Sequence, residues 1–68
     1  MANTHDFAIQ NEGTIFLLTP WTPAAQGWIA EHLPEDATHF GASVVVEHRF
    51  IRDILAGIVN GGLTVTRL

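Results

Sequence analysis

The chain has 68 residues and no cysteine, so we expect one small domain over residues 1–68, without a disulfide framework or a thiolate metal site. Its formal net charge of −4 comes from seven acidic residues against three arginines, which disfavours binding to a phosphate backbone and predicts no nucleic-acid partner. Apolar residues make up 47% of the chain and six more are glycine, a share above the usual ~45–50% for the two together in soluble domains. This surplus predicts apolar surface that is left over for a partner.

The chain begins with MANTHDF, which has neither a basic nor an apolar segment of the kind that targeting peptides carry. Residues 1–5 show no periodicity, and we expect them to be disordered. The longest apolar run, Ile15 to Leu18, is far shorter than the roughly 20 residues of a membrane span. We therefore expect a cytoplasmic protein without a membrane partner, in a reducing compartment that suits a chain lacking cysteine.

Two short β-prone runs come first, Phe7–Gln10 and Thr14–Leu18, separated by Asn11-Glu12-Gly13. A three-residue connection that ends in glycine favours a hairpin turn that closes through a positive φ at Gly13. The second run is apolar almost throughout, which is typical of a central strand with a neighbour on each side.

A helix is predicted after the Thr19-Pro20-Trp21-Thr22-Pro23 break. Thr22 is a suitable N-cap and Pro23 suits the first helical position, where a missing N–H costs nothing. One apolar stripe with helical spacing contains Ala25, Trp28, Ile29, His32 and Leu33. Pro34 is expected to end this helix.

Residues 42–46 admit two interpretations. The β-branched run Val44-Val45-Val46 indicates a third strand, whereas the helical spacing of Val44, His48 and Ile51 allows a helix that begins near Ser43. We favour the strand, followed by a helix from Glu47 to Asn60. Gly61-Gly62 is expected to stop that helix through a left-handed residue, and Leu63–Thr66 alternates as a last strand.

These elements predict an α+β fold with a two-layer ββαβαβ order, in which a small sheet carries two helices on one face. The alternative lacks the third strand and starts the second helix near Ser43.

The sequence gives little support for catalysis. The four histidines, His5, His32, His39 and His48, are not spaced as metal ligands on one element, and no nucleophile motif or phosphate-binding loop occurs, so we expect no enzyme, no metal and no cofactor. Glu47-His48-Arg49 is the one compact polar triple. It stands where a strand is expected to meet a helix, and an anion-binding or minor enzymatic role there is kept as an alternative.

The sequence supports a role in binding better than a role in catalysis. Trp21, Phe40 and Phe50 are candidate anchors, because large aromatic side chains dominate protein interfaces. Glu31, Glu35 and Asp36 form a small acidic patch around the end of the first helix, which suits a basic partner.

The segments LLTP, EHLPEDA and VEHR lie within residues 7–66, and the chain there resembles a group of small, uncharacterised bacterial and phage-borne proteins with no assigned activity. The resemblance implies a bacterial or mobile-element origin. We expect a non-enzymatic, self-associating interaction module, most simply a homodimer. The alternative is a small acidic regulator or inhibitor of a basic host or phage-defence protein.

Overall fold

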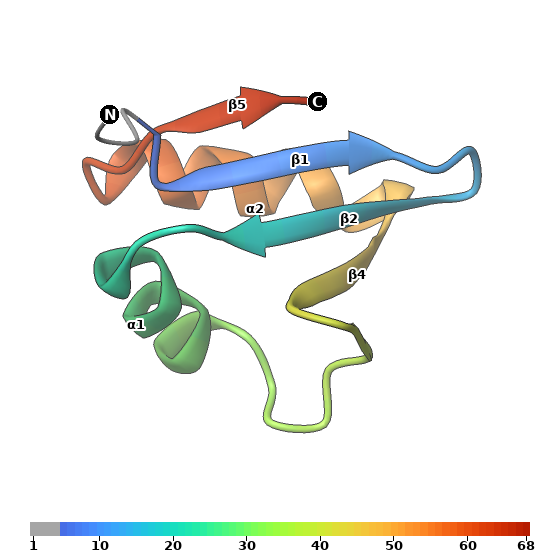
Figure 1. Ribbon diagram of the computed structural model, residues 1–68, viewed down its shortest axis with the longest axis horizontal. Helices are drawn as coiled ribbons and strands as arrows, with labels where there is room; N and C mark the ends of the chain where they lie inside the picture. Colours follow the sequence, from blue (N-terminus) through green and yellow to red (C-terminus); the bar gives the residue numbers. More distant parts are fainter. Residues whose placement is uncertain (1–4) are drawn as a thin grey trace.

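A computed structural model of the chain describes residues 5–68, which form one five-stranded mixed sheet and two helices (Figure 1). The strands lie in the order β3-β4-β2-β1-β5, with β1 and β5 parallel and the other neighbours antiparallel. The elements are β1 (Phe7–Asn11), β2 (Ile15–Pro20), α1 (Pro23–His32), β3 (His39–Phe40), β4 (Ser43–Glu47), α2 (His48–Asn60) and β5 (Val65–Arg67). The predicted α+β class is confirmed.

The predicted hairpin is present, and β2 is central, between β1 and β4. Gly13 has a φ of +93° in the turn, and its N–H donates to the side-chain oxygen of Asn11 at 2.8 Å. Glu12 N–H donates to the carbonyl of Ile15 at 2.9 Å and closes the turn. The strand continues to Pro20, and one further main-chain hydrogen bond follows it, from the N–H of Trp21 to the carbonyl of Asp6 at 2.7 Å.

Residues 43–47 are extended, so the alternative of a helix from Ser43 is wrong. The pairing Leu18↔Val44 and Phe16↔Val46 buries both valines, and this burial fixes the register of β4 against β2. α2 then begins at His48, directly after the strand.

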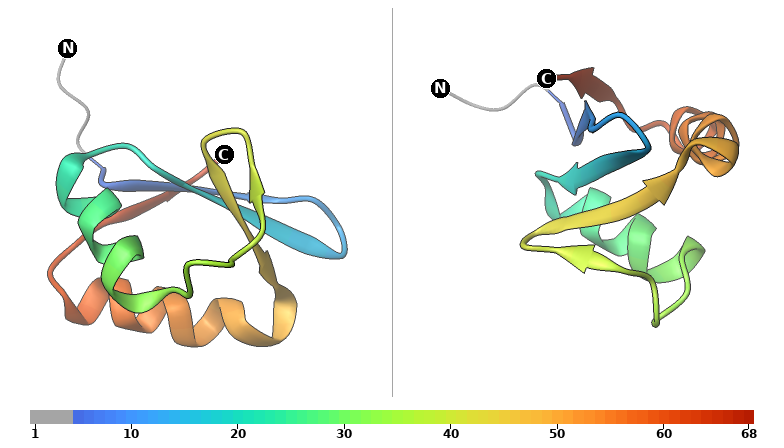
Figure 2. Two further views of the ribbon diagram at one scale, coloured as in Figure 1. Left: turned by 90° about the horizontal axis from the view of Figure 1, so that it is seen from below. Right: turned by 90° about the vertical axis from the view of Figure 1, so that its right-hand side faces the viewer.

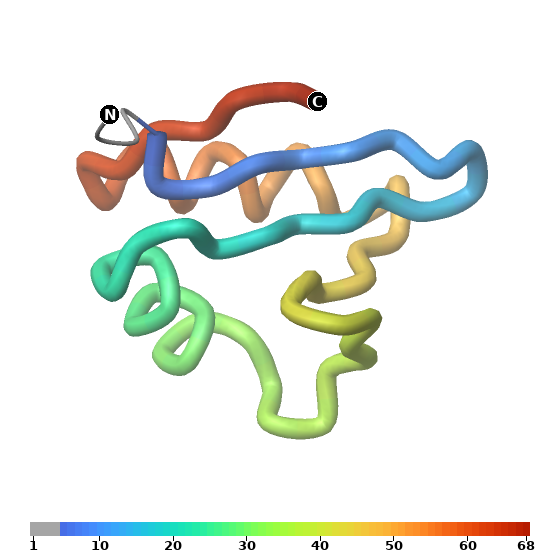
Figure 3. Tube along the Cα trace, viewed as in Figure 1, coloured from blue at the N-terminus to red at the C-terminus, as the bar shows by residue number. Residues whose placement is uncertain are grey.

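The strand β3 was not predicted. It has two residues, His39 and Phe40, and pairs with Ser43 and Val44 across a turn in which Gly41 has a φ of +62°. The structure therefore has the order ββαββαβ, with His39 in an edge strand. Figure 3 shows the long connector from α1 running out and back before it reaches β4.

The predicted N-cap of α1 at Thr22 and the predicted stop of α2 at Gly61-Gly62 are confirmed, whereas α2 begins at His48, one residue after the predicted start at Glu47. The side chain of Thr22 accepts the N–H of Ala25 at 3.1 Å as the N-cap of α1. At the end of α2, Gly62 has a φ of +82° and donates to the Val59 carbonyl, while Leu63 N–H donates to that of Ile58. This pair of hydrogen bonds is a Schellman motif, which satisfies carbonyls that the helix leaves open.

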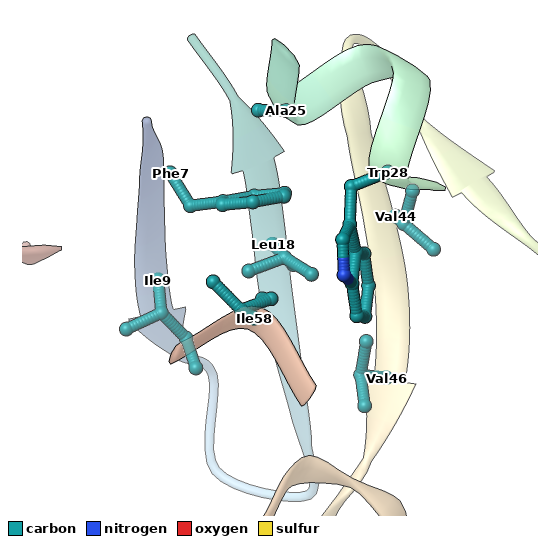
Figure 4. Close-up of a cluster of buried hydrophobic side chains, with 8 residues drawn as sticks. All are labelled: Phe7, Ile9, Leu18, Ala25, Trp28, Val44, Val46 and Ile58. Carbon is teal, nitrogen blue, oxygen red and sulfur yellow. The ribbon is translucent and has the colours of Figure 1, made fainter. Parts of the chain in front are cut away.

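The core lies between the sheet and the two helices, which Figure 2 shows on the same side of the β1–β2 hairpin. Trp28, which belongs to the predicted apolar stripe of α1, is 9% exposed and makes an edge contact with Phe7 at 6.0 Å between ring centroids. Figure 4 shows its indole beside the β4 valines. The core comprises Phe7, Ile9, Leu18, Ala25, Trp28, Val44, Val46 and Ile58.

Neither helix within residues 5–68 has the length and apolar character that crossing a membrane requires. The disorder predicted for residues 1–5 falls, except at His5, on residues outside the described range.

Candidate interaction surfaces

The first candidate surface is the sheet face that points away from the helices. Side chains alternate along each strand, so the neighbours of the buried residues on β2 and β4 lie on the opposite face. Leu17 pairs with Val45 there, and Ile15 lies two residues from Leu17 on the same side. All three are only partly buried. With Phe40 they form what we call the sheet-face patch: Ile15, Leu17, Phe40 and Val45.

Phe40 protrudes from this patch. It pairs with Ser43, which places it on the same face, and its side chain is 68% exposed. Figure 2 shows the β3–β4 turn projecting on the side of the hairpin away from the helices. The four patch residues line a hollow of about 280 Å³ together with Glu12 and Thr14. The patch therefore contains a projecting ring directly beside an apolar hollow.

The sheet edges are less suited to association than this face. The edge strands β3 and β5 have two and three residues, and short edge strands limit pairing with another sheet. Beyond the patch the open face becomes polar, where the hydroxyls of Thr19 and Ser43 are hydrogen-bonded at 2.6 Å. An apolar contact on this side is thus confined to the sheet-face patch.

The second candidate surface is a groove of about 620 Å³ bounded by β4, α2 and the segment that follows α1, which we call the acidic groove. Residues 44–47 line it from β4, and of these Val44 and Val46 are buried. Val45 lines both this groove and the hollow of the sheet-face patch. Leu33 comes from the end of α1, while Phe50 and Ile54 come from α2. Phe50 is 47% exposed, so an apolar wall of the groove faces solvent.

Three exposed acidic residues also line the groove: Asp36, Glu47 and Asp53. They come from the connector, from the end of β4 and from α2, and the fold brings them to one opening. Arg49 and Glu47 form an ion pair at 3.6 Å, between side chains that are both well exposed. Asp36 and Asp53 thus add negative charge to an apolar surface.

The polar triple at the β4–α2 junction does not converge on one point. Arg49 approaches Glu47 and also lies over the ring of Phe50, at 4.8 Å from its centroid. His48 instead contacts the ring of Phe16 at 4.5 Å between centroids. The anion-binding alternative needs His48 and Arg49 to act together, and here the two side chains have different neighbours.

The remaining predicted residues are dispersed. Trp21 is 40% exposed, lines neither surface and donates its main-chain N–H to the carbonyl of Asp6 at 2.7 Å. Glu31 and Glu35 are exposed but do not line the acidic groove, so of the predicted acidic patch only Asp36 does. Phe40 and Phe50 belong to different surfaces.

Most residues of these surfaces were not predicted: Ile15, Leu17 and Val45 in the sheet-face patch, and Leu33, Val44, Val46, Asp53 and Ile54 in the acidic groove. A signal for the first set was present. Ile15–Leu18 and Val44–Val46 are apolar at every position, so each strand must have apolar side chains on both of its faces. Two short helices cover only one face of the sheet. No comparable signal links Asp53 to Asp36, because their proximity depends on the path of the connector.

The histidines are held separately. His32 stacks on Trp28 with 4.3 Å between ring centroids, and its Nδ1 lies 2.9 Å from the Trp28 carbonyl. Nδ1 of His39 lies 2.8 Å from the Ala37 carbonyl. Within the part of the chain that the structure describes, no three His, Asp or Glu side chains are placed to hold a metal ion.

No protein-family model matches the chain, and neither the curated proteins nor the solved structures include a significant match.

Proposed function

We propose that this protein is a non-enzymatic interaction module that forms a homodimer through the sheet-face patch. The observation that carries the proposal is the uncovered apolar patch on the sheet, with Phe40 as its most exposed large side chain. We take the chain to be a cytoplasmic protein of a bacterium or phage, as the resemblance of its LLTP, EHLPEDA and VEHR segments implies.

The shape of the patch supports a second copy as the occupant. A twofold contact needs a surface that is complementary to itself. Here a projecting Phe40 and a hollow lined by Leu17 and Val45 lie side by side on one face. A twofold rotation would place the ring of each copy in the hollow of the other, and stacked sheets pack face to face at about 10 Å in this way.

Light scattering after size-exclusion chromatography tests the proposal. We expect a dimer for the wild type and a monomer for Phe40→Glu, which introduces a charge at the centre of the contact. Val59→Glu is the matched control, because Val59 is 65% exposed on α2 and lines neither surface. A wild type that stays monomeric at high micromolar concentration would refute the proposal, as would a dimer that Phe40→Glu leaves intact. Circular dichroism checks that both variants are folded.

A second function, favoured by the carboxylates around the acidic groove, is that of a small regulator or inhibitor that binds a basic protein. Affinity capture with Asp36→Asn, Glu47→Gln and Asp53→Asn combined tests it. We expect the combined variant to lose a basic protein that the wild type captures. Unchanged capture of every protein would contradict this function.

A further inference from the structure

We propose that the acidic groove binds a cationic amphipathic helix of a partner protein, an inference that rests on the second function above. The apolar residues of the partner helix would contact Leu33, Phe50 and Ile54. The lysines or arginines of that helix would face Asp36, Glu47 and Asp53.

The position of the groove in the fold favours a helix. α1 and α2 are packed on the same face of the sheet, and the groove lies between α2, β4 and the chain that leaves α1. A helix that enters there would join the existing helical layer. Its apolar side chains, at intervals of three and four residues, would meet Phe50 and Ile54, which are themselves four apart on α2.

The polar groups of the groove argue against a small molecule as the natural occupant. Small-molecule sites orient the ligand with a few polar groups that are set within a largely enclosed cavity. None of the polar or charged residues that line the groove is buried. The polar side chains here are exposed carboxylates around an apolar centre, which is the arrangement of a protein interface with its polar rim.

The negative charge of the groove determines that the partner segment is positively charged. Asp36 and Asp53 take part in no ion pair within the described range, and Glu47 has only the exposed contact with Arg49. An anionic segment or an anionic lipid surface would be repelled, whereas lysine or arginine would pair with these carboxylates. The chain has no lysine and three arginines, so it offers few cations of its own to compete.

The test uses three synthetic peptides of about 14 residues, a length at which helices are marginally stable alone. One has leucine and lysine at amphipathic helical spacing, the second has glutamate in place of lysine, and the third has the leucine–lysine composition in scrambled order. Fluorescence anisotropy of labelled peptide gives the affinity, and amide chemical shifts in NMR spectra locate the contact. We expect the first peptide alone to bind, with shift changes at Phe50, Asp53 and Ile54.

Two combined variants distinguish an effect of the groove carboxylates from an effect of the net charge of the protein. Asp36→Asn with Glu47→Gln and Asp53→Asn should weaken binding of the leucine–lysine peptide by about tenfold, as expected for the loss of three exposed ion pairs. Glu12→Gln with Glu31→Gln and Glu35→Gln removes the same charge from residues outside the groove and should change the affinity by less than about twofold. Phe50→Ser should also weaken binding, and Phe40→Ser should not.

Several results would overturn the inference. These are the absence of binding, equal binding of the scrambled or the glutamate peptide, and equal weakening by both charge variants. If peptide binding fails in one of these ways while the wild type still captures a basic protein, the second function stands and the groove is not its site. If peptide binding succeeds and no basic protein is captured, the groove recognises this chemistry but the regulatory role is wrong.

Discussion

The hydroxyl group of Thr22 donates a hydrogen bond to Oδ1 of Asp6 at 2.8 Å, while its oxygen accepts the N–H of Ala25 at 3.1 Å. The other carboxylate oxygen of Asp6 accepts the main-chain N–H of Thr64 at 3.1 Å. One side chain just before β1 therefore connects the N-cap of α1 to the segment that leads into β5. Asp6 was not singled out from the sequence, because its partners are distant along the chain.

These hydrogen bonds predict an acid-sensitive fold. The bond from Thr22, followed by that from the Thr64 main chain, holds the pKa of the Asp6 carboxyl below its usual value of 3.8. A carboxyl whose pKa is lower in the folded state stabilises the fold above its unfolded pKa, and this contribution is lost as the pH falls through the folded value. We expect the free energy of unfolding to decrease below about pH 4. Asp6→Asn should remove part of that decrease.

Urea unfolding followed by circular dichroism, in a pH series from neutral to acid, measures this effect. Glu12→Gln is the control, since Glu12 is exposed and its hydrogen bond to Ile15 uses its main-chain N–H and not its carboxyl. The role of Asp6 is excluded if Asp6→Asn and the wild type lose stability in parallel as the pH falls.

The N-cap gives a second prediction. Thr22→Ala removes the oxygen that accepts the Ala25 N–H and the hydroxyl that donates to Asp6, and we expect it to lower the free energy of unfolding by about 1 kcal/mol. Thr22→Ser keeps a hydroxyl at the same position and should retain most of the stability. Denaturant unfolding compares the three proteins. Equal losses in the serine and alanine variants would show that the hydroxyl is not responsible.

Local chemistry explains why much of the fold was predictable. The hairpin around Gly13, the cap at Thr22 and the stop at Gly62 each depend on a few consecutive residues, and all three are confirmed. The strand at Ser43–Glu47 was harder, since its valines also fit a helical stripe, and pairing with β2 decides between the two. The short β3 had no sequence signal because two residues show no periodicity.

The candidate surfaces were less predictable for a physical reason. Phe40 and Phe50 were both identified as anchors, but whether they share a surface depends on the two faces of β4, which the sequence pattern does not separate. Asp36 lines the acidic groove whereas Glu31 and Glu35 do not, although the three are close in sequence. Which residues lie next to one another on these surfaces depends on the pairing of the strands and on the path of the connector.

The stop of α2 gives a third prediction. Gly62 has a φ of +82°, a conformation that costs other residues about 1–2 kcal/mol, so Gly62→Ala should lower the free energy of unfolding by that amount. Gly61→Ala is the matched control, because Gly61 has a φ of −80° and an added Cβ would meet its nearest atoms at ordinary contact distances. Thermal unfolding compares the two. Similar losses in both variants would mean that the backbone conformation of Gly62 is not what the helix end requires.

The two glycines inside the helices give the last prediction, because the same substitution meets different surroundings. Alanine is favoured over glycine in a helix by about 0.5–1 kcal/mol. A Cβ at Gly27 would have no heavy atom within 4 Å, so Gly27→Ala should stabilise the protein by about that amount. At Gly57 the Cβ would lie 3.1 Å from Cζ2 of Trp28, and the indole cannot move away without loosening its contact with Phe7. Gly57→Ala should therefore gain nothing or lose stability. Urea unfolding measures both variants, and Trp28 fluorescence in a Trp21→Phe background should change only for Gly57→Ala. Equal stabilisation by the two substitutions would contradict this prediction, because it would show that the core beside Trp28 can accommodate an added Cβ at Gly57.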